Sequence, residues 1–544
     1  MTQPRVQSLA RAAIAVAGVT VLARVVGFGR VLVFAHTVGP SCLGDAYYTA
    51  NTIPNILFDV VAGGALSTVA VPLLAGPVDA GDGDTADRTT SALLTWTLLV
   101  LLPVLAVTVL LAGPIVHLLV GNGHPGCSAA AERAVGARML RVFAPQLLLY
   151  GAVVVLTGVL QAHRRFVAAA VAPLLSSVVV IGAYVAFAIA ADRSETGLVG
   201  LTRDHELLLS VGTTLGVVAL LLPLIFPLRR TGRRLRPTLR FPPGAAATAR
   251  RLAIAGAVTL GSQDLATAGI LRLANDRGAT GAVVLYTLAW TVFLVPWAVL
   301  AVPLATTAFP TMVARWEAGD TARYAATAAS TSRAVVLATA GAAAVLVAAA
   351  LPVARVVILG APGSAAPAEL ARALATFAPG LVGYGLVAHL ARVHVARGDP
   401  RTPAIATGLG WLLVVLADIG LVIALPRHWT AAALGIGTTV GMTAAAAGLV
   451  VALGRRAGVA ALDGLARTTV SSITSAVLAA GLGALLAHAL PAAGAVVSTA
   501  VSVGVGGLCL VLFVAVIRVL DPGTLRLVLR GRAVALVPGL GRDG

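Results

Sequence analysis

Two arginines lie inside an otherwise apolar stretch near the start of the chain. Arg24 and Arg30 interrupt the segment ARVVGFGRVLVFAHTVGP, residues 23–40. An arginine at the centre of a membrane helix costs roughly 2.5–3.5 kcal/mol on insertion scales, so it is a functional candidate that faces a wet cavity or a partner. On a helix, a spacing of six residues sets the two side chains about 9 Å apart along the axis and roughly 120° apart around it. They could therefore line one broad wall of a cavity. The alternative is that Arg30 snorkels toward an interface and Arg24 pairs with an acid.

The next apolar stretch carries polar groups that suit such a cavity. In GDAYYTANTIPNILFDVVAGGALS, residues 44–67, Asp45 could partner the arginines and Asn55 could line the cavity. Pro54 removes a helical hydrogen bond and predicts a bend, and the glycine pair at 63–64 loosens the helix again. The alternative for the glycines is ordinary helix packing around small residues.

Further ionisable residues fall in apolar stretches of the second half. Asp264 and Asp418 could bind a hard cation such as Na⁺ or relay a proton, and Arg272 could add charge to the cavity. Alternatively, each carboxylate pairs with a nearby arginine or caps a broken helix.

These residues must be positioned by membrane helices. The chain has 544 residues, of which 58% are hydrophobic and 11% charged, with a mean hydropathy of +0.96, far from the composition of a soluble domain. A span needs about 20 apolar residues. We count fourteen, near 10–35, 45–74, 90–112, 135–160, 166–190, 206–228, 252–274, 282–310, 331–354, 370–391, 402–425, 431–453, 468–489 and 495–519. The first lacks a cleavage site and is interpreted as a retained helix.

The net charge of +18 follows membrane topology. Every second loop is rich in arginine, whereas the loops between them carry acids, as in residues 191–206. The sequence therefore predicts both termini in the cytoplasm. The three cysteines are too few and scattered for a disulfide framework or a metal knuckle, so they are interpreted as incidental. The chain has no lysine, hence no phosphate-binding loop, and shows no nucleophile or metal-ligand motif; we expect neither an enzyme nor a cofactor.

An internal repeat organises the spans. FAPQLLLYG at 143–151 matches FAPGLVGYG at 377–385, and the segment 62–74 matches 300–312 at nearly the same offset; chance similarity of apolar helices is the alternative. We predict an N-lobe of spans 1–6 (1–228), an arginine-rich cytoplasmic linker (229–251), a C-lobe of spans 7–12 (252–453), and spans 13–14 with a cytoplasmic tail (454–544). Two parallel six-helix copies would enclose a cavity at mid-membrane and suit alternating access.

The motifs resemble the MurJ (MviN) lipid II flippases of the MOP superfamily, as a divergent, actinobacterial-type member. ARVVGFGRVLVFAHTVG, DAYYTANTIPN and GALSTVAVPLL are similar to the family's opening, and the segments 140–166 and 383–403 look like its two matched lobe segments. The resemblance implies fourteen spans in the bacterial cytoplasmic membrane and a role in peptidoglycan and cell-wall biogenesis. It also implies that arginines bind the diphosphate of a lipid-linked precursor in a central cavity, and that a groove by the last two helices takes the lipid tail.

Arg24, Arg30 and Asp45 stand at matching positions. Bidentate guanidinium–phosphate bonds would then explain the arginines. The sequence also departs from the family's pattern: an arginine is replaced at Phe58, a glutamate at Gly63, a further arginine at Thr291, and the asparagine before Asp418 at Val414.

The leading hypothesis is a lipid II flippase working by alternating access, driven by the membrane potential or an ion gradient. The alternatives are an exporter of another polyprenyl-linked glycan, natural product or drug, and a scaffold that recruits cell-wall proteins through its arginine-rich loops. The expected partners are the lipid-linked substrate, the bilayer and cell-wall synthesis proteins, and no nucleic acid.

Overall fold

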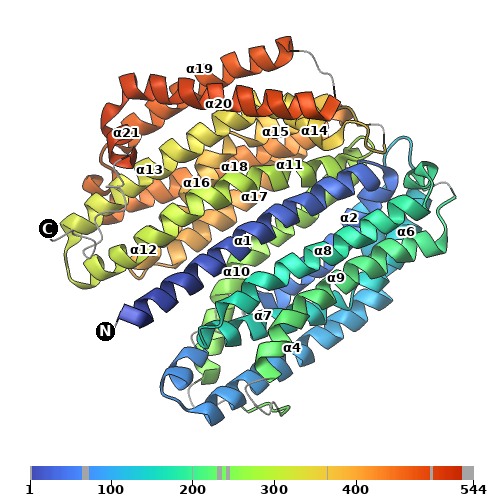
Figure 1. Ribbon diagram of the computed structural model, residues 1–544, viewed down its shortest axis with the longest axis horizontal. Coiled ribbons are helices and arrows are strands. Elements are labelled where there is room, and N and C mark those ends of the chain that lie inside the picture. The colour runs from blue at the N-terminus through green and yellow to red at the C-terminus, as the bar shows by residue number, and fades with distance from the viewer. Residues whose placement is uncertain are drawn as a thin grey trace. The chain divides into compact units, whose positions relative to one another are not determined.

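The computed structural model describes residues 3–63, 73–198, 200–229, 236–240, 245–363, 365–490 and 494–529. Within these residues every regular element is a helix and none is a strand, as the ribbon diagram shows (Figure 1). The predicted all-α class is therefore confirmed.

The helices fall into two compact units. Unit 1 comprises 1–276 with 360–364, and unit 2 comprises 277–359 with 365–544. Unit 1 contains α1 (Gln3–Thr37), α2 (Cys42–Phe58), the π-turn η1 (Asp59–Gly63), α4 (Gly83–Leu110), α5 (Ala112–Val120), α6 (Ala129–Phe143), α7 (Gln146–Ala162), α8 (Phe166–Ala190), the 3₁₀ turn η2 (Arg193–Gly197), α9 (Arg203–Arg229) and α10 (Ala245–Arg277).

Unit 2 holds the remaining elements. They are α11 (Ala282–Pro296), the π-turn η3 (Trp297–Ala301), α12 (Val302–Glu317), α13 (Thr321–Ala348), α14 (Ala350–Ile358), α15 (Pro367–Phe377), α16 (Gly380–Ala396), α17 (Arg401–Ala424), the 3₁₀ turn η4 (Arg427–Trp429), α18 (Thr430–Ala457), the 3₁₀ turn η5 (Val459–Leu462), α19 (Leu465–Ala489), α20 (Gly494–Leu520) and α21 (Pro522–Leu529).

Among the described residues, eleven helices are long and apolar enough to cross a membrane, or up to twelve if the bent pair α15 and α16 forms one span. The sequence predicted fourteen. Of the two further stretches, 45–74 contains α2, which has only 17 residues, and residues 64–72, which the structure does not describe. The other, 252–274, lies within α10. The exact count of fourteen is thus not confirmed.

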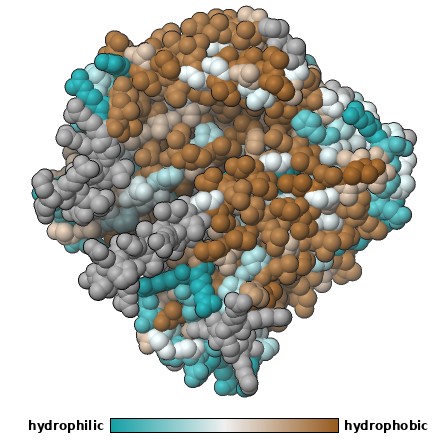
Figure 2. Space-filling model, viewed as in Figure 1, coloured by the Kyte–Doolittle hydropathy of each residue, from teal (hydrophilic) through white to brown (hydrophobic). Residues whose placement is uncertain are grey.

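The surface of single helices explains why these segments belong in a bilayer. On α17 the large side chains that are at least 40% exposed are Ile405, Leu409, Leu412, Leu416, Ile419 and Ile423. Their spacing of three and four residues marks one face of a helix. Apolar side chains cover much of the face in view, with hydrophilic ones toward its margins (Figure 2). An apolar helix face of this kind is solvated by lipid chains.

The internal repeat reappears in the helix boundaries. The first and last residues of α13 follow those of α4 by a constant number of positions, and the same number separates α14 from α5. It also separates the π-turns η1 and η3. A slightly shorter offset, that of the FAP motifs, relates α7 to α16. The first turns match as well, because Asp82 caps α4 at Thr85 N and Asp320 caps α13 at Arg323 N, both at 3.0 Å. Two copies of one helical unit account for this agreement.

The compact units have other boundaries than the expected lobes: unit 2 also includes α19, α20 and α21, and unit 1 includes residues 360–364. The helix α10 begins the second repeat, yet its described part belongs to unit 1. Most of the predicted linker 229–251 lies in or beside residues that the structure does not describe. Its described piece runs along α4, where Trp96 Nε1 donates to Leu239 O (3.1 Å) and Thr238 N to Thr95 Oγ1 (3.1 Å). The arginines 530 and 532 of the predicted tail lie outside the described residues.

Candidate functional site

Arg30 lies in unit 1 among aromatic hydroxyl groups. It sits partly buried on α1, and its electrostatic neighbours are Tyr184, Tyr47, Tyr48 and Tyr150. No ion pair joins it to a carboxylate of the described residues. Four of the seven tyrosines of the chain lie close enough to this cation to act on it electrostatically. A guanidinium without a counter-charge keeps its donors available to an anion.

The tyrosines are fixed by one another and by α9. The Tyr47 hydroxyl lies 2.8 Å from that of Tyr184 and 2.7 Å from Thr213 Oγ1. Phe34, one turn after Arg30 on α1, packs its ring against Tyr47 and Tyr48 at centroid distances of 5.1 and 4.5 Å. We call Tyr47, Tyr48, Tyr150 and Tyr184 the tyrosine cage. Its packing holds the cage in place when no ligand is bound.

Arg24 occupies a different setting on the same helix. Its side chain is exposed and makes no ion pair with the described residues, so the alternative that it pairs with an acid gains no support there. The exposure of Arg24 and the burial of Arg30 agree with their different angular positions on a continuous helix.

The sequence predicts a bend at Pro54, whereas the departure from α-helical geometry lies just after α2. The helix continues through the buried Pro54 and turns into the π-turn η1 at Asp59. Asn55 donates from Nδ2 to Asn51 O (3.1 Å) and interacts with Tyr150 of the cage. Phe58, at the position of the family's arginine, is 6% exposed and packs in an apolar cluster with Leu74. It contributes no charge to the site.

Asp264 lies on α10 in the same unit. It is 8% exposed, its Oδ2 has no hydrogen-bond partner, and the nearest charge that acts on it is Asp59. The two carboxylates expected to act together are assigned to different compact units, because Asp418 belongs to unit 2.

Asp45 is fully buried at the start of α2. Its Oδ2 lies 3.1 Å from His124 Nε2, and His124 Nδ1 lies 3.4 Å from Glu132 Oε1. Beside this cluster Cys42 and Cys127 form a disulfide. The interpretation of the cysteines as incidental was wrong, because the fold brings together two residues that are 85 positions apart.

Arg272 also lies near this cluster. Its Nη1 is 3.1 Å from Asp276 Oδ1 on the same helix, and Asp276 Oδ1 accepts from Asn122 N at 3.0 Å. Gly121 lies directly against the guanidinium, with no room for a β-carbon. The charge of Arg272 is thus engaged with the α5–α6 loop.

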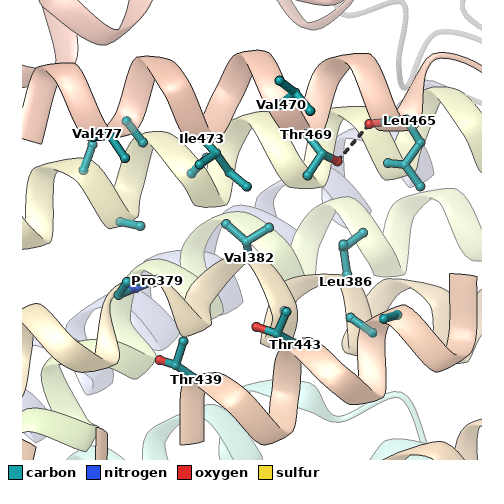
Figure 3. Close-up of a pocket in the computed structure, with 18 of the residues that line it drawn as sticks. Pro379, Val382, Leu386, Thr439, Thr443, Leu465, Thr469, Val470, Ile473 and Val477 are labelled. Carbon is teal, nitrogen blue, oxygen red and sulfur yellow. Dashed lines mark hydrogen bonds between the residues drawn. The ribbon is translucent and has the colours of Figure 1, made fainter. Parts of the chain in front are cut away.

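Unit 2 contains a cavity of about 990 Å³ between α13, α16, α18 and α19. Its walls are alanine, valine, leucine and isoleucine side chains, and the polar groups among the lining residues are the hydroxyls of Thr439, Thr443 and Thr469 (Figure 3). No charged side chain lines it. Of the last two long helices, α19 lines the cavity and α20 does not. The space suits an apolar chain.

Asp418 lies on the buried face of α17 in unit 2. It is fully buried, and neither carboxylate oxygen has a hydrogen-bond partner among the described residues. Gly437 of α18 presses against the carboxylate, so any side chain there would overlap it. An unpartnered buried carboxylate is costly, which makes Asp418 a candidate for binding a proton or a cation.

The described residues of the second repeat show no counterpart of the Arg30 site. Tyr286 and Tyr384 stand at the repeat positions of Tyr48 and Tyr150, but they join an aromatic cluster around Trp290. Thr291, where the family has an arginine, donates its hydroxyl to Thr287 O at 2.8 Å. Among the described residues, Arg30 of unit 1 is the arginine that has four tyrosines as its neighbours.

Several of these residues escaped sequence reasoning. The tyrosine pair beside Asp45 and Tyr150 were visible as parts of motifs, whereas Tyr184, His124 and Glu132 carry no local signal. Their proximity depends on contacts between helices far apart in sequence.

The sequence is similar to that of lipid II flippases. The family model described as lipid II flippase MurJ matches residues 34–504. The lipid II flippase MurJ of Burkholderia cenocepacia is 32% identical over 181 residues, which cover 33% of this chain and 34% of that protein. The probable lipid II flippase MurJ of Synechocystis is 30% identical over 229 residues, covering 42% and 41%. These matches thus span only about a third to two fifths of the relatives' length.

Solved structures show a similar fold. A lipid II flippase MurJ in an inward closed conformation aligns with a TM-score of 0.70 at 16% identity, over 93% of this chain and 99% of that one. An inward-facing multidrug resistance MATE family transporter of the MOP superfamily aligns with a TM-score of 0.65 at 15% identity, over 81% and 98%.

Proposed function

The chain belongs to the lipid II flippase MurJ family, and from this premise we propose that it moves a lipid-linked peptidoglycan precursor, lipid II, across the bacterial cytoplasmic membrane. The observation that carries the proposal is Arg30. It is a guanidinium in a membrane helix, surrounded by the tyrosine cage and without a carboxylate partner among the described residues. Guanidinium groups bind diphosphate oxygens in bidentate fashion, and weak local screening strengthens that attraction.

The roles of the other residues follow from where they lie. The tyrosine hydroxyls add hydrogen-bond donors beside Arg30, and the exposed Arg24 meets the headgroup on its approach. The apolar cavity between α13, α16, α18 and α19 takes the polyprenyl tail, whose hydrocarbon needs no polar partner. Pro54, Asn55 and η1 supply a helix segment that can change its bend as access alternates.

We further propose that an ion or the membrane potential drives the cycle, with Asp418 and Asp264 as carriers of a proton or Na⁺. Their support is the burial of both carboxylates and the absence of hydrogen-bond partners for Asp418 Oδ1 and Oδ2 and for Asp264 Oδ2. The distribution of arginines among loops favours cytoplasmic termini.

Replacement of an essential lipid II flippase tests the proposal in cells. A depleted bacterial strain carrying this chain should grow, and the Arg24→Ala/Arg30→Ala double variant should not grow at equal membrane abundance. Arg193→Ala serves as control, because Arg193 is an exposed arginine of η2. Growth of the double variant would contradict the assigned role of the arginines.

The rival is transport of another anionic amphiphile by the same fold. Phe58 favours it, because a buried aromatic ring replaces one of the family's arginines. Failure to support growth despite normal insertion into the membrane, together with transport of another polyprenyl diphosphate, would select the rival.

A further inference from the structure

The first turns of α2 are held by a covalent bond and by a buried charge cluster. Cys42 is bonded to Cys127, and Asp45, one turn later, contacts His124. Both partners come from the loop 121–128 that joins α5 to α6. We call the disulfide together with Asp45, His124 and Glu132 the α2 clamp.

The clamp is dry and closely paired. Asp45 is 0%, His124 4% and Glu132 1% exposed. His124 places Nε2 3.1 Å from Asp45 Oδ2 and Nδ1 3.4 Å from Glu132 Oε1. The imidazole ring therefore lies between Asp45 of α2 and Glu132 of α6, and its removal would take a polar neighbour away from each buried carboxylate.

Other groups hold the beginning of the same loop. Arg133 of α6 donates to Gly121 O. Asn122 N donates to Asp276 Oδ1 of α10, which also pairs with Arg272. His124 holds the middle of the loop and the disulfide holds its end. The loop is thus fixed along its length, and the imidazole cannot move away from Asp45 without breaking other contacts.

The clamp leads directly to the Arg30 site. Tyr47 and Tyr48 follow Asp45 by two and three residues on α2, and both are electrostatic neighbours of Arg30. Tyr47 is the member of the cage that also bonds to Tyr184 and Thr213. A displacement of the first turns of α2 would carry both hydroxyls away from Arg30.

We propose that His124 is a positioning residue of the transport site: it holds Asp45, and through the first turns of α2 it sets Tyr47 and Tyr48 around Arg30. The disulfide keeps His124 in that place. The inference rests on the proposed function for its consequence in transport, whereas the clamp itself is a property of unit 1.

The first test measures lipid II flux in vesicles containing the purified chain. His124→Leu, which removes both polar contacts, should lower flux about tenfold, since the buried carboxylate of Asp45 loses the imidazole beside it. His124→Gln, whose amide can donate to Asp45, should restore most of the flux. If His124 acts through Asp45, the Asp45→Asn/His124→Leu double variant should be no slower than Asp45→Asn alone. Multiplied losses in the double variant, or no rescue by glutamine, would overturn the positioning role.

The second test needs no transport. In a Cys509→Ala background the clamp provides the only cysteines, and the rate at which a dithiol reduces the disulfide of the folded protein is followed by thiol trapping. His124→Leu should speed reduction about tenfold, because the loop loses its central anchor. His488→Leu, at an exposed histidine of α19, should leave the rate unchanged.

The two tests distinguish a failure of the clamp from a failure of the proposed function. Equal reduction rates for wild type and His124→Leu would overturn the clamp whatever the flux. If the wild type moves no lipid II while reduction responds to His124, the proposed function fails and the clamp stands.

Discussion

Arg30 combines two properties that rarely occur together in a membrane protein. It is shielded by the tyrosine cage, so its charge is weakly screened, and it has no carboxylate partner among the described residues. The cage lowers the cost of burial through its hydroxyl dipoles while leaving the positive charge in place. In the proposed function, the diphosphate of the ligand would supply an anion here.

Loss of Arg30 should therefore weaken binding of an anionic lipid. For Arg30→Gln we expect the dissociation constant of a polyprenyl diphosphate to rise about 10- to 100-fold, the equivalent of one or two charged hydrogen bonds. Arg30→Lys should recover only part of this, since lysine cannot bind in bidentate fashion. Titration of the purified protein measures both, and Arg193→Gln provides the matched control. Unchanged affinity in Arg30→Gln would exclude Arg30 from the binding site.

Replacement of Asp418 should stabilise the protein and impair its function. Its unpartnered carboxylate is costly to bury, so Asp418→Asn should raise the free energy of unfolding by about 1 kcal/mol or more. The same change should abolish the dependence of transport on the ion or proton gradient. Thermal unfolding and flux measured with and without a gradient check the two halves. Asp463→Asn, at an exposed aspartate of unit 2, is the control. A destabilised variant that keeps its gradient dependence would contradict both.

At the scale of elements, the α17–α18 pair depends on glycine. A β-carbon at Gly441 would overlap Val414 and lie 2.5 Å from Gly410 O, whereas a β-carbon at Gly448 on the same helix meets nothing within 4 Å. Close approach of backbones through small residues is how membrane helices associate. Gly441→Ala should lower the free energy of unfolding by about 1–3 kcal/mol, and Gly448→Ala should not lower it. Thermal unfolding in detergent compares them; equal midpoints would mean that the contact is dispensable.

The turn between α16 and α17 depends on one carboxylate. Burial raises the pKa of Asp399, but hydrogen bonds from Thr402 and the charges of Arg456 and His394 outweigh it, so the net pKa lies below its usual value. A lowered pKa means that the stabilisation is complete above about pH 4 and is lost as pH falls through the folded value.

Asp399→Asn should thus lower the free energy of unfolding by about 1 kcal/mol, by the same amount at pH 6 and pH 8. The difference from wild type should narrow only below about pH 4. Thermal unfolding across this range measures it, with Asp463→Asn again as control. A difference that changes between pH 6 and pH 8 would point to His394 and not to the carboxylate.

Much of the secondary structure could be predicted from local sequence. Apolar length located the spans, and the offsets of the repeated motifs recur in the helix boundaries, because both depend on patterns within one helix. The π-turn η1 ends at Gly63, the first glycine of the pair that the sequence singled out, whereas Pro54 lies inside α2. The Cys42–Cys127 bond, the partners of Asp45 and the tyrosine cage were missed, because each joins residues whose proximity only the packing of whole helices creates.

At the scale of the whole molecule, transport of lipid II requires one environment for a polar headgroup and another for an apolar tail. In the proposed function, the polar head needs cations and donors, which Arg30 and the tyrosine cage would supply, and the tail needs an apolar space, which the cavity between α13, α16, α18 and α19 would supply. The repeat relates several helices of unit 1 to helices of unit 2, and their side chains have diverged. In the proposed function, the Arg30 site binds the headgroup and the cavity takes the tail.

Filling the cavity should therefore impair transport without touching the arginines. Val382 lines it and is labelled in Figure 3. Val382→Trp should reduce lipid II flux at least about tenfold, because the indole takes the volume that the tail needs. It should leave binding of a short-chain diphosphate unchanged. Leu409→Trp, on the exposed face of α17, is the matched control. Full flux in Val382→Trp would show that the tail travels elsewhere.

The central claim is tested most directly by the flux of lipid II itself. Purified chain is placed in vesicles with fluorescent lipid II, and the fraction that crosses the bilayer is measured with an impermeant quencher, for wild type, Arg30→Gln and Arg193→Gln. The account predicts rapid transfer by wild type and Arg193→Gln, and transfer no faster than in protein-free vesicles for Arg30→Gln. Equal transfer by Arg30→Gln and wild type, or none by wild type, would contradict it.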